Sequence, residues 1–200
     1  MKNILCQSLN IRYPILLGGM LQVGRGRLAA AVSEAGGLGI IGAGAWTKDE
    51  LREQITALRE RTDKPFGVNI PARSPRAPEL VEVILEQKVP AVTTSAGDPS
   101  RYTRDLQKAG IYVMHVVPTV EHARKAQETG IDAIIAEGYE SILFSLKEAE
   151  HEWGEEESSG ARRIMDLGRK TPTDRQSVHQ LWRGFLPEKG ELVVFQLPVP

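Results

Sequence analysis

The chain has 200 residues, of which 41% are hydrophobic and 26% charged, a composition that excludes a disordered or fibrous protein. It carries 25 Lys and Arg against 26 Asp and Glu, a formal net charge of -1, so it lacks the basic excess that nucleic-acid binding needs. Cys6 is the single cysteine, which excludes a disulfide within the chain. No stretch of sequence reaches the length of an apolar membrane span, and we expect a cytoplasmic protein without a membrane partner.

Six short apolar runs are predicted to be strands, and each is followed by small residues, an amphipathic stretch and a glycine. The runs lack polar alternation, as is typical of parallel strands covered on both faces. They start about every 20–28 residues, which is the spacing of βα units. The six predicted strands are Ile15–Leu17, Leu38–Ile41, Phe66–Ile70, Ala91–Thr94, Ile111–Val117 and Ile131–Ala136.

The predicted helices between these strands carry start and stop signals. Thr47 and Glu50 form a capping-box pattern, after which Leu51, Ile55 and Leu58 fall on one helix face. Glycine ends three of the helices just before a strand, at Gly36, Gly110 and Gly130. The repeat therefore indicates an α/β fold with a parallel sheet.

The pattern stops after Glu140. Blocks of charge follow at Lys147–Glu152, Glu155–Glu157 and Arg162–Arg175. Such blocks are typical of a solvated helix face or a mobile segment, and an interaction tail is the alternative. Within this part only Leu192–Leu197 has the composition of a further strand. We therefore expect two unlike regions, residues 1–140 and an atypical charged segment at 141–200.

Residues that follow the predicted strands are the candidates for a ligand site, because parallel βα folds bind ligands at the carboxyl ends of their strands. Small residues there permit close backbone approach, and Asn69 offers a donor and an acceptor, which together suit a flat heteroaromatic ligand such as a flavin or a nucleobase. The candidates are Gly18, Gly19, Met20, Asn69, Ser95, Gly97, Glu137 and Gly138.

Each candidate also has a structural interpretation. A glycine after a strand often serves only a tight turn, and Met20 could fill the core. Asn69 could brace the turn before Pro71, and Glu137 could do the same at its own strand end, although a carboxylate there also suits a cavity. His115 lies inside a predicted strand and is expected to be a hydrogen-bonded core residue rather than a base.

A dinucleotide-binding pattern competes with this interpretation. Residues 24–29, Gly-Arg-Gly-Arg-Leu-Ala, match GxGxxA soon after a predicted strand. The Rossmann site needs a carboxylate at the end of the second strand to hold the ribose, and here Ile41 is followed by Gly42-Ala43-Gly44. We also expect no metal site, because no His has metal-ligand spacing with another His, Cys or carboxylate.

Several short motifs within residues 8–140, taken in order, resemble those of the nitronate monooxygenase family, formerly 2-nitropropane dioxygenases. The closely related flavin-dependent enoyl-acyl-carrier-protein reductases share much of this pattern, which does not separate the two activities. The motifs are Asn10–Ile15 with Gly18-Gly19-Met20, Ala35–Gly39, Pro65–Ile70, Thr93–Gly97 and Ala136-Glu137-Gly138.

The resemblance implies a TIM-type (β/α)₈ barrel that holds FMN at its carboxyl face. By motif position, the backbone of Gly18-Gly19-Met20 and the Asn69 amide would contact the isoalloxazine ring, with Glu137-Gly138 nearby. The activity implied is the oxidation of alkyl nitronates with molecular oxygen, in which the flavin carries the redox chemistry.

The sequence departs from the family after Glu140, where the family continues into Ala-Gly-Gly-His with the catalytic histidine. Here Ser141-Ile142-Leu143 follows, so no catalytic residue is carried over, and the glycine-rich phrases for the FMN phosphate are also missing. A complete barrel typically needs about 250 residues, so we expect an incomplete barrel of about six βα units. An enoyl-thioester reductase and an inactive truncated or frame-shifted fragment stay as alternatives, and an open barrel edge could mediate self-association.

Overall fold

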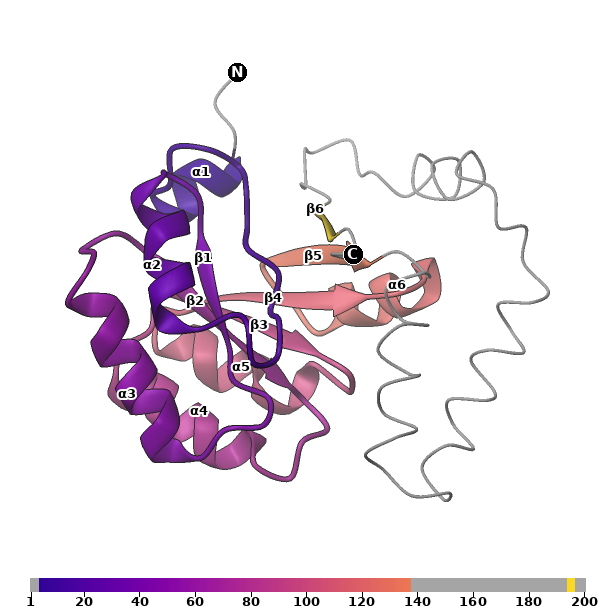
Figure 1. The fold of residues 1–200 in the computed structure, drawn as a ribbon. Coiled ribbons are helices and arrows are strands. Elements are labelled where there is room, and N and C mark those ends of the chain that lie inside the picture. The colour runs from indigo at the N-terminus through magenta and orange to yellow at the C-terminus, as the bar shows by residue number, and fades with distance from the viewer. Residues whose placement is uncertain (1–3, 138–193, 197–200) are drawn as a thin grey trace.

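The computed structural model of the chain describes residues 4–137 and 194–196. Its centre is a six-stranded, all-parallel sheet whose strands lie side by side in chain order (Figure 1). The strands are β1 (Gly39–Gly42), β2 (Phe66–Pro71), β3 (Ala91–Ser95), β4 (Tyr112–Val117), β5 (Ala133–Glu137) and β6 (Val194–Gln196). The helices are α1 (Ile4–Leu9), α2 (Gly26–Glu34), α3 (Lys48–Arg59), α4 (Ala77–Glu86), α5 (Ser100–Lys108) and α6 (Val120–Glu128).

Five of the six predicted strands are confirmed as β1 to β5, and the first is not a full strand. In the segment Ile15–Leu17 only Leu16 forms a bridge, parallel to Leu38. Pro14 has no N–H to give, and the chain leaves the sheet at Gly18, so the ladder is confined to this bridge. The run Leu192–Leu197 does contain a strand, because β6 pairs with β5.

The start and stop signals of the helices act as expected. The Thr47 hydroxyl accepts a hydrogen bond from Glu50 N, and the Glu50 carboxylate accepts one from Thr47 N, which completes the capping box of α3. The stripe of Leu51, Ile55 and Leu58 is fully buried. Gly110 and Gly130 follow α5 and α6 with φ of +78°, a conformation in which a side chain would be strained.

The two faces of the sheet are covered differently. Helices α2 to α5 cover most of the outer face, where their apolar residues form the larger core with residues such as Ile41, Val68 and Val92. Helix α6 covers the rest of this face, where Ala123 and Ala126 form a smaller cluster with Val117 and Ala136. The inner face carries Leu38, Ile40 and Met114, and there α1 packs with Leu5 and Leu9. The short helix α1 was not predicted, and it covers apolar residues that the outer helices do not reach.

The strand order decides between the two architectures that the sequence left open. In a dinucleotide-binding sheet the order reverses near the middle, which creates the crevice for the ligand. Here the order β1 to β6 never reverses, and helices α2 to α6 share one face, as in a (β/α) barrel. The expected fold class, an incomplete barrel of this type, is confirmed over the described residues.

The GxGxxA glycines have a packing role instead. Gly26 N donates to Gln54 Oε1 at 3.0 Å, and a Cβ on Gly26 would lie 2.2 Å from the Gln54 carbonyl oxygen. A Cβ on Gly24 would lie 2.8 Å from the Met20 carbonyl oxygen. These glycines therefore let α2 pack against α3 and the chain fold back on itself.

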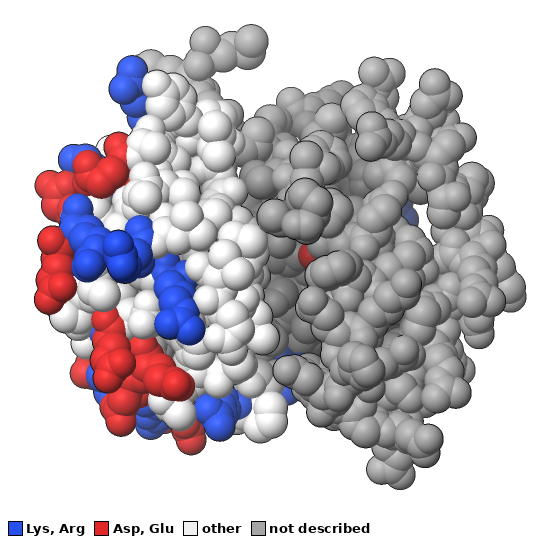
Figure 2. Space-filling model, viewed as in Figure 1, with Lys and Arg blue, Asp and Glu red and all other residues white. Residues whose placement is uncertain are grey.

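The surface of the described residues is divided between charged and uncharged regions. Figure 2 shows Lys, Arg, Asp and Glu mixed over the side of the molecule that the outer helices form, beside a largely uncharged face. Ion pairs such as Arg52–Glu86, at 2.9 Å, join α3 to α4. All the exposed large hydrophobic residues found in the described part of the chain fall between residues 4 and 28: Ile4, Tyr13, Ile15, Leu21, Val23 and Leu28. Within the same part, no helix combines the length and the apolar character that a bilayer crossing requires.

Candidate functional site

Asn69 lies at the carboxyl end of β2, on the inner face of the sheet. It is buried, with 8% of its surface exposed, and parallel pairing places it beside Thr93 of β3. Its Nδ2 donates to the Thr93 hydroxyl at 2.9 Å and to the Thr93 carbonyl oxygen at 3.3 Å. The amide is therefore fixed by the neighbouring strand rather than by the turn before Pro71.

The Gly18-Gly19-Met20 segment lies against this asparagine. A Cβ on Gly19 would lie 2.4 Å from Asn69 Cβ and 2.8 Å from Asn69 Oδ1, a separation that real side chains do not tolerate. Gly19 is therefore required for the backbone to lie over the Asn69 side chain. The contact places Gly19 and Asn69 side by side, and their binding of a ligand stays a prediction.

Met20 contributes through its backbone. Its carbonyl oxygen accepts a hydrogen bond from Gly24 N at 2.9 Å, and a Cβ on Gly42, at the end of β1, would lie 2.4 Å from it. Gly42 N in turn donates to the Gly24 carbonyl oxygen at 2.8 Å. The loop after the first apolar run is therefore held directly against the end of β1.

Ser95 and Gly97 mark the end of β3 at the same edge. Ser95 pairs in register with Pro71, and its carbonyl oxygen accepts a hydrogen bond from Ala72 N. Gly97 has φ of +141°, and a Cβ there would lie 3.0 Å from Arg73 N. These residues bring the loop after β3 against the loop after β2, and a ligand contact for them stays a prediction.

Glu137 and Gly138 belong to the last strand of the candidate edge. Glu137 ends β5, is half-buried, and pairs in register with Gln196 of β6. Gly138 and the segment after Glu140, where the family's histidine was sought, lie outside the described residues. The edge formed by the described residues is therefore built mainly by the loops after the first apolar run and after β1 to β3.

His115 faces the outer layer and is a core residue, as expected. It has 5% of its surface exposed, and its Nδ1 lies 2.7 Å from the Thr94 hydroxyl. The same hydroxyl lies 3.3 Å from the Met114 carbonyl oxygen, so the pair is tied to the backbone of β4. Burial lowers the pKa of His115 from 6.5 to about 4, so the ring is neutral at physiological pH.

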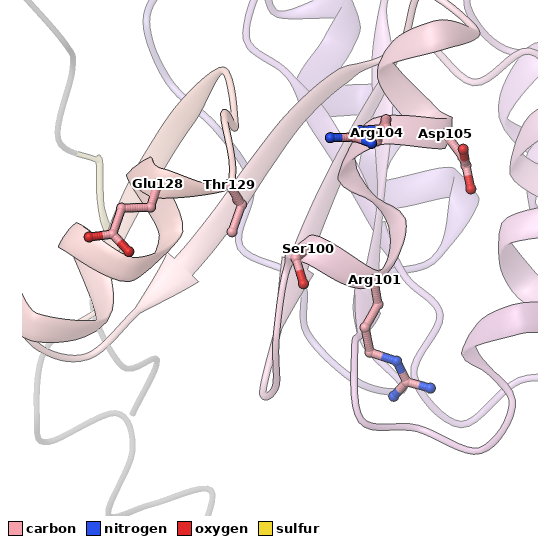
Figure 3. A pocket seen from close by; sticks show the side chains of 6 residues that line it. All are labelled: Ser100, Arg101, Arg104, Asp105, Glu128 and Thr129. Atoms are coloured by element: carbon pink, nitrogen blue, oxygen red, sulfur yellow. The ribbon is translucent and has the colours of Figure 1, made fainter.

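A pocket lies between α5 and α6, and its charged side chains do not form a binding or catalytic arrangement. Figure 3 shows that the side chains of Arg101 and Asp105 point away from Glu128, so the charges do not converge on one point. In the described part of the chain, no group of three or more His, Cys, Asp or Glu residues is placed to hold a metal ion. The residues that line the pocket are Ser100, Arg101, Arg104, Asp105, Glu128 and Thr129.

Sequence reasoning missed the role of Thr93. The residue lies two positions before Ser95, so the alternation of a strand places both on the inner face. Its contact with Asn69, however, depends on the register between β2 and β3, which the sequence does not state. The alternation alone could have marked Thr93 as a neighbour of the site.

Comparisons with known proteins agree with this geometry. The family model described as nitronate monooxygenase matches residues 2–80 and 73–141. A probable nitronate monooxygenase of Staphylococcus saprophyticus is 32% identical to the chain, over 66% of this chain and 48% of that protein. An indene-carboxyl-CoA dehydrogenase of Rhodococcus jostii is also 32% identical, over 70% of this chain and 40% of that protein.

A solved structure is similar over the same region. FabK from Thermotoga maritima superposes with a TM-score of 0.68 and 52% sequence identity, covering 70% of this chain and 45% of that one. The chain thus spans between two fifths and a half of the length of these relatives. The matched region contains every described candidate residue.

Proposed function

The chain belongs to the nitronate monooxygenase family, and from this premise we propose that it supplies the ring-binding part of a cytoplasmic, FMN-dependent oxidoreductase. The observation that carries the proposal is the Asn69 side chain, fixed at the carboxyl edge of the inner face with the Gly19 backbone against it. Such an edge combines close backbone approach with a fixed polar group, as a flat heteroaromatic ring requires. The single cysteine, Cys6, agrees with a reducing compartment.

The residues of this edge fit an isoalloxazine ring. The Gly18-Gly19-Met20 backbone would lie along the ring, and the Asn69 amide would hydrogen-bond its polar edge. Asn69 Oδ1 accepts no hydrogen bond from any described residue, which leaves an acceptor available to a ligand. Ser95, Gly97, Glu137 and Gly138 belong to the same proposed cofactor site.

The substrate that we propose is an alkyl nitronate, with molecular oxygen as the second reactant. The chemistry that FMN supplies when bound is the transfer of electrons from the nitronate to oxygen. The described residues of the chain bind and orient the ring, and none of them is assigned as a catalytic acid or base. The apolar inner face below the ring, with Met114 and Ile40, excludes water from beneath the site.

Flavin binding by the full chain tests the proposal. Titration with FMN, followed by quenching of flavin fluorescence, should show weak binding, because the glycine-rich segments that would hold the FMN phosphate are missing. Asn69→Ala should weaken it by on the order of 1–3 kcal/mol, because a polar edge of the ring loses its partner. Gln107→Ala is the matched control, since the Gln107 amide also donates to a backbone carbonyl, that of Gly130, but lies away from the edge. Equal FMN affinity for wild type and Asn69→Ala would contradict the proposal.

Reduction of an enoyl thioester by NADH is the second candidate function. The Rhodococcus jostii relative, whose name specifies a CoA derivative as substrate, favours a thioester. Oxygen consumption with a nitronate supports the first function, whereas NADH-dependent loss of an enoyl-CoA supports the second. A chain that binds no flavin and turns over neither substrate would match the third alternative, an inactive fragment.

Self-association is a separate proposal. Leu16 is bridged to Leu38 on one side, and among the described residues no strand pairs on its other side. Ile15, next to Leu16 in the chain, is exposed, and such edges attract other chains. Sedimentation velocity of the full chain should show oligomers that Ile15→Lys dissociates; a wild-type monomer at all concentrations would contradict this.

A further inference from the structure

The orientation of the Asn69 amide is determined by its partners. Asn69 Nδ2 lies 3.3 Å from the Thr93 carbonyl oxygen, and a backbone carbonyl can only accept a hydrogen bond. The nitrogen side of the amide must therefore face Thr93, because the reverse orientation would place two acceptors together. The Thr93 hydroxyl, at 2.9 Å, takes the other amide hydrogen.

Asn69 Oδ1 is thus the one polar atom of the side chain that remains for a ligand. No described residue donates to it, and it is not among the fully buried unpaired polar atoms, so it keeps contact with solvent. It lies beside Gly19, at 2.8 Å from the position of an added Cβ. The sequence suggested both a donor and an acceptor at this position, whereas the structure leaves only the acceptor.

We propose that Thr93 is a positioning residue that commits Asn69 to acting as a hydrogen-bond acceptor, so that the site selects a ring edge carrying an N–H donor. This inference rests on the proposed flavin function. The isoalloxazine ring has one such group, the N3–H between its two carbonyls. A ring methylated at N3 would present a methyl group to Oδ1 and leave this acceptor unpaired.

Thr93 suits this role because it is rigid and buried. Its exposed fraction is 2%, and a β-branched side chain in a strand has few rotamers, so the hydroxyl stays in place. The hydroxyl contact is shorter than the contact to the carbonyl oxygen. Without the hydroxyl one amide hydrogen would lose its partner, and only the longer contact to the Thr93 carbonyl oxygen would still oppose rotation of the amide. The orientation of Asn69 would then be less strictly held.

The first arm of the test needs no flavin. In the full chain labelled with ¹⁵N, the Asn69 side-chain NH₂ should give two protected signals in wild type. Thr93→Ser, which keeps the hydroxyl, should preserve them, whereas Thr93→Val should shift them and speed their exchange with water. Thr129→Val is the matched control, because the Thr129 hydroxyl donates to Ala126 O away from the site. Unchanged Asn69 signals in Thr93→Val would overturn the role of Thr93.

The second arm compares lumiflavin with 3-methyllumiflavin, two probes without a phosphate. Wild type and Thr93→Ser should bind lumiflavin at least about tenfold more tightly than 3-methyllumiflavin, whereas Thr93→Val should show a smaller preference. Equal wild-type affinity for the two probes would overturn the inference. Failure to bind either probe would overturn the flavin proposal and with it the selection of an N–H edge, while the NMR arm would still decide whether Thr93 fixes the amide.

Discussion

Two adjacent threonines of β3 take part in buried polar pairs on opposite faces of the sheet. Thr94 points outward and pairs with His115, beneath the helices. Thr93 points inward and pairs with Asn69, at the open carboxyl edge. Both threonines are almost fully buried, with 0% and 2% of their surfaces exposed.

The two pairs differ in what they leave unsatisfied. On the outer face Thr94 has hydrogen bonds to His115 and to the Met114 carbonyl oxygen, and burial keeps the imidazole neutral. On the inner face the pair leaves Asn69 Oδ1 without a donor among the described residues. A closed polar pair contributes stability, whereas a pair with a spare acceptor at an open edge can bind a ligand. Changes on the outer face should therefore affect folding, and changes on the inner face should affect binding.

The largest effect is expected from an added methyl group at a glycine of the outer face. A Cβ on Gly39 would lie 1.8 Å from the Ala29 carbonyl oxygen of α2, and backbone gives way only if the helix moves. Gly39→Ala should lower the free energy of unfolding by about 3 kcal/mol or more. Gly19→Ala, whose added methyl group meets the Asn69 side chain at 2.4 Å rather than a helix backbone at 1.8 Å, should cost less stability and displace Asn69, which impairs FMN binding. Urea denaturation measures the stability of both variants, and FMN titration measures their binding. An equal loss of stability in Gly39→Ala and Gly19→Ala would contradict the expected difference between the two faces.

The pH dependence of the free energy of unfolding should reflect the buried pair of Thr94 and His115 on the outer face. The pKa of His115 is about 4 in the folded state and 6.5 when unfolded, so between these values the unfolded chain binds the extra proton. Stability is complete above pH 6.5 and falls as the pH drops toward 4. From pH 7.5 to pH 5 this residue should cost about 2 kcal/mol of unfolding free energy. His115→Gln should show a smaller loss in urea titrations at the two pH values, and an identical loss would contradict this assignment.

Removing the hydroxyl of Thr94 should have an intermediate effect. Thr94→Val leaves the buried His115 Nδ1 without its hydrogen-bond partner and should lower the free energy of unfolding by about 1–2 kcal/mol. Thr93→Val should cost less, because the Thr93 carbonyl oxygen still accepts from Asn69. Thermal or urea unfolding of the two variants measures the difference, and the reverse order would show that the inner pair is the structural one.

A third polar pair, in solvent, gives the smallest effect. Thr47 and Glu50 exchange hydrogen bonds at the start of α3, where water can replace each of them. Thr47→Ala should lower the free energy of unfolding by about 1 kcal/mol or less. FMN affinity should not change. A loss larger than that of Thr94→Val would mean that burial does not set the strength of these pairs.

Features that depend on neighbours in sequence could be predicted. The capping box at Thr47, the glycine stops at Gly110 and Gly130 and the strands β1 to β5 all follow from short patterns that act locally. The position of Asn69 at a strand end was also predictable, because the end of an apolar run defines it. The prediction of a full strand at Ile15–Leu17 was wrong. The apolar pattern does not show that Pro14 and Gly18 limit its pairing to a single bridge.

Features that depend on register could not be predicted from the sequence. The pairing of Asn69 with Thr93 requires β2 and β3 to be aligned at one particular offset. The same holds for the contact of Gly19 with Asn69, which joins a loop to a strand that is distant in the chain. Helix α1 has only six residues, so its docking on the inner face is decided by tertiary packing.

The docking of α1 has a consequence for the order in which the molecule assembles. Leu5 and Leu9 are synthesised first, yet they share a cluster with Met114 and Ile135, from strands near the far end of the described core. During translation the helix must wait, with its apolar side uncovered, until those strands emerge from the ribosome. Contacts of such long sequence separation slow folding, so closure of the inner face by α1 should be a late event.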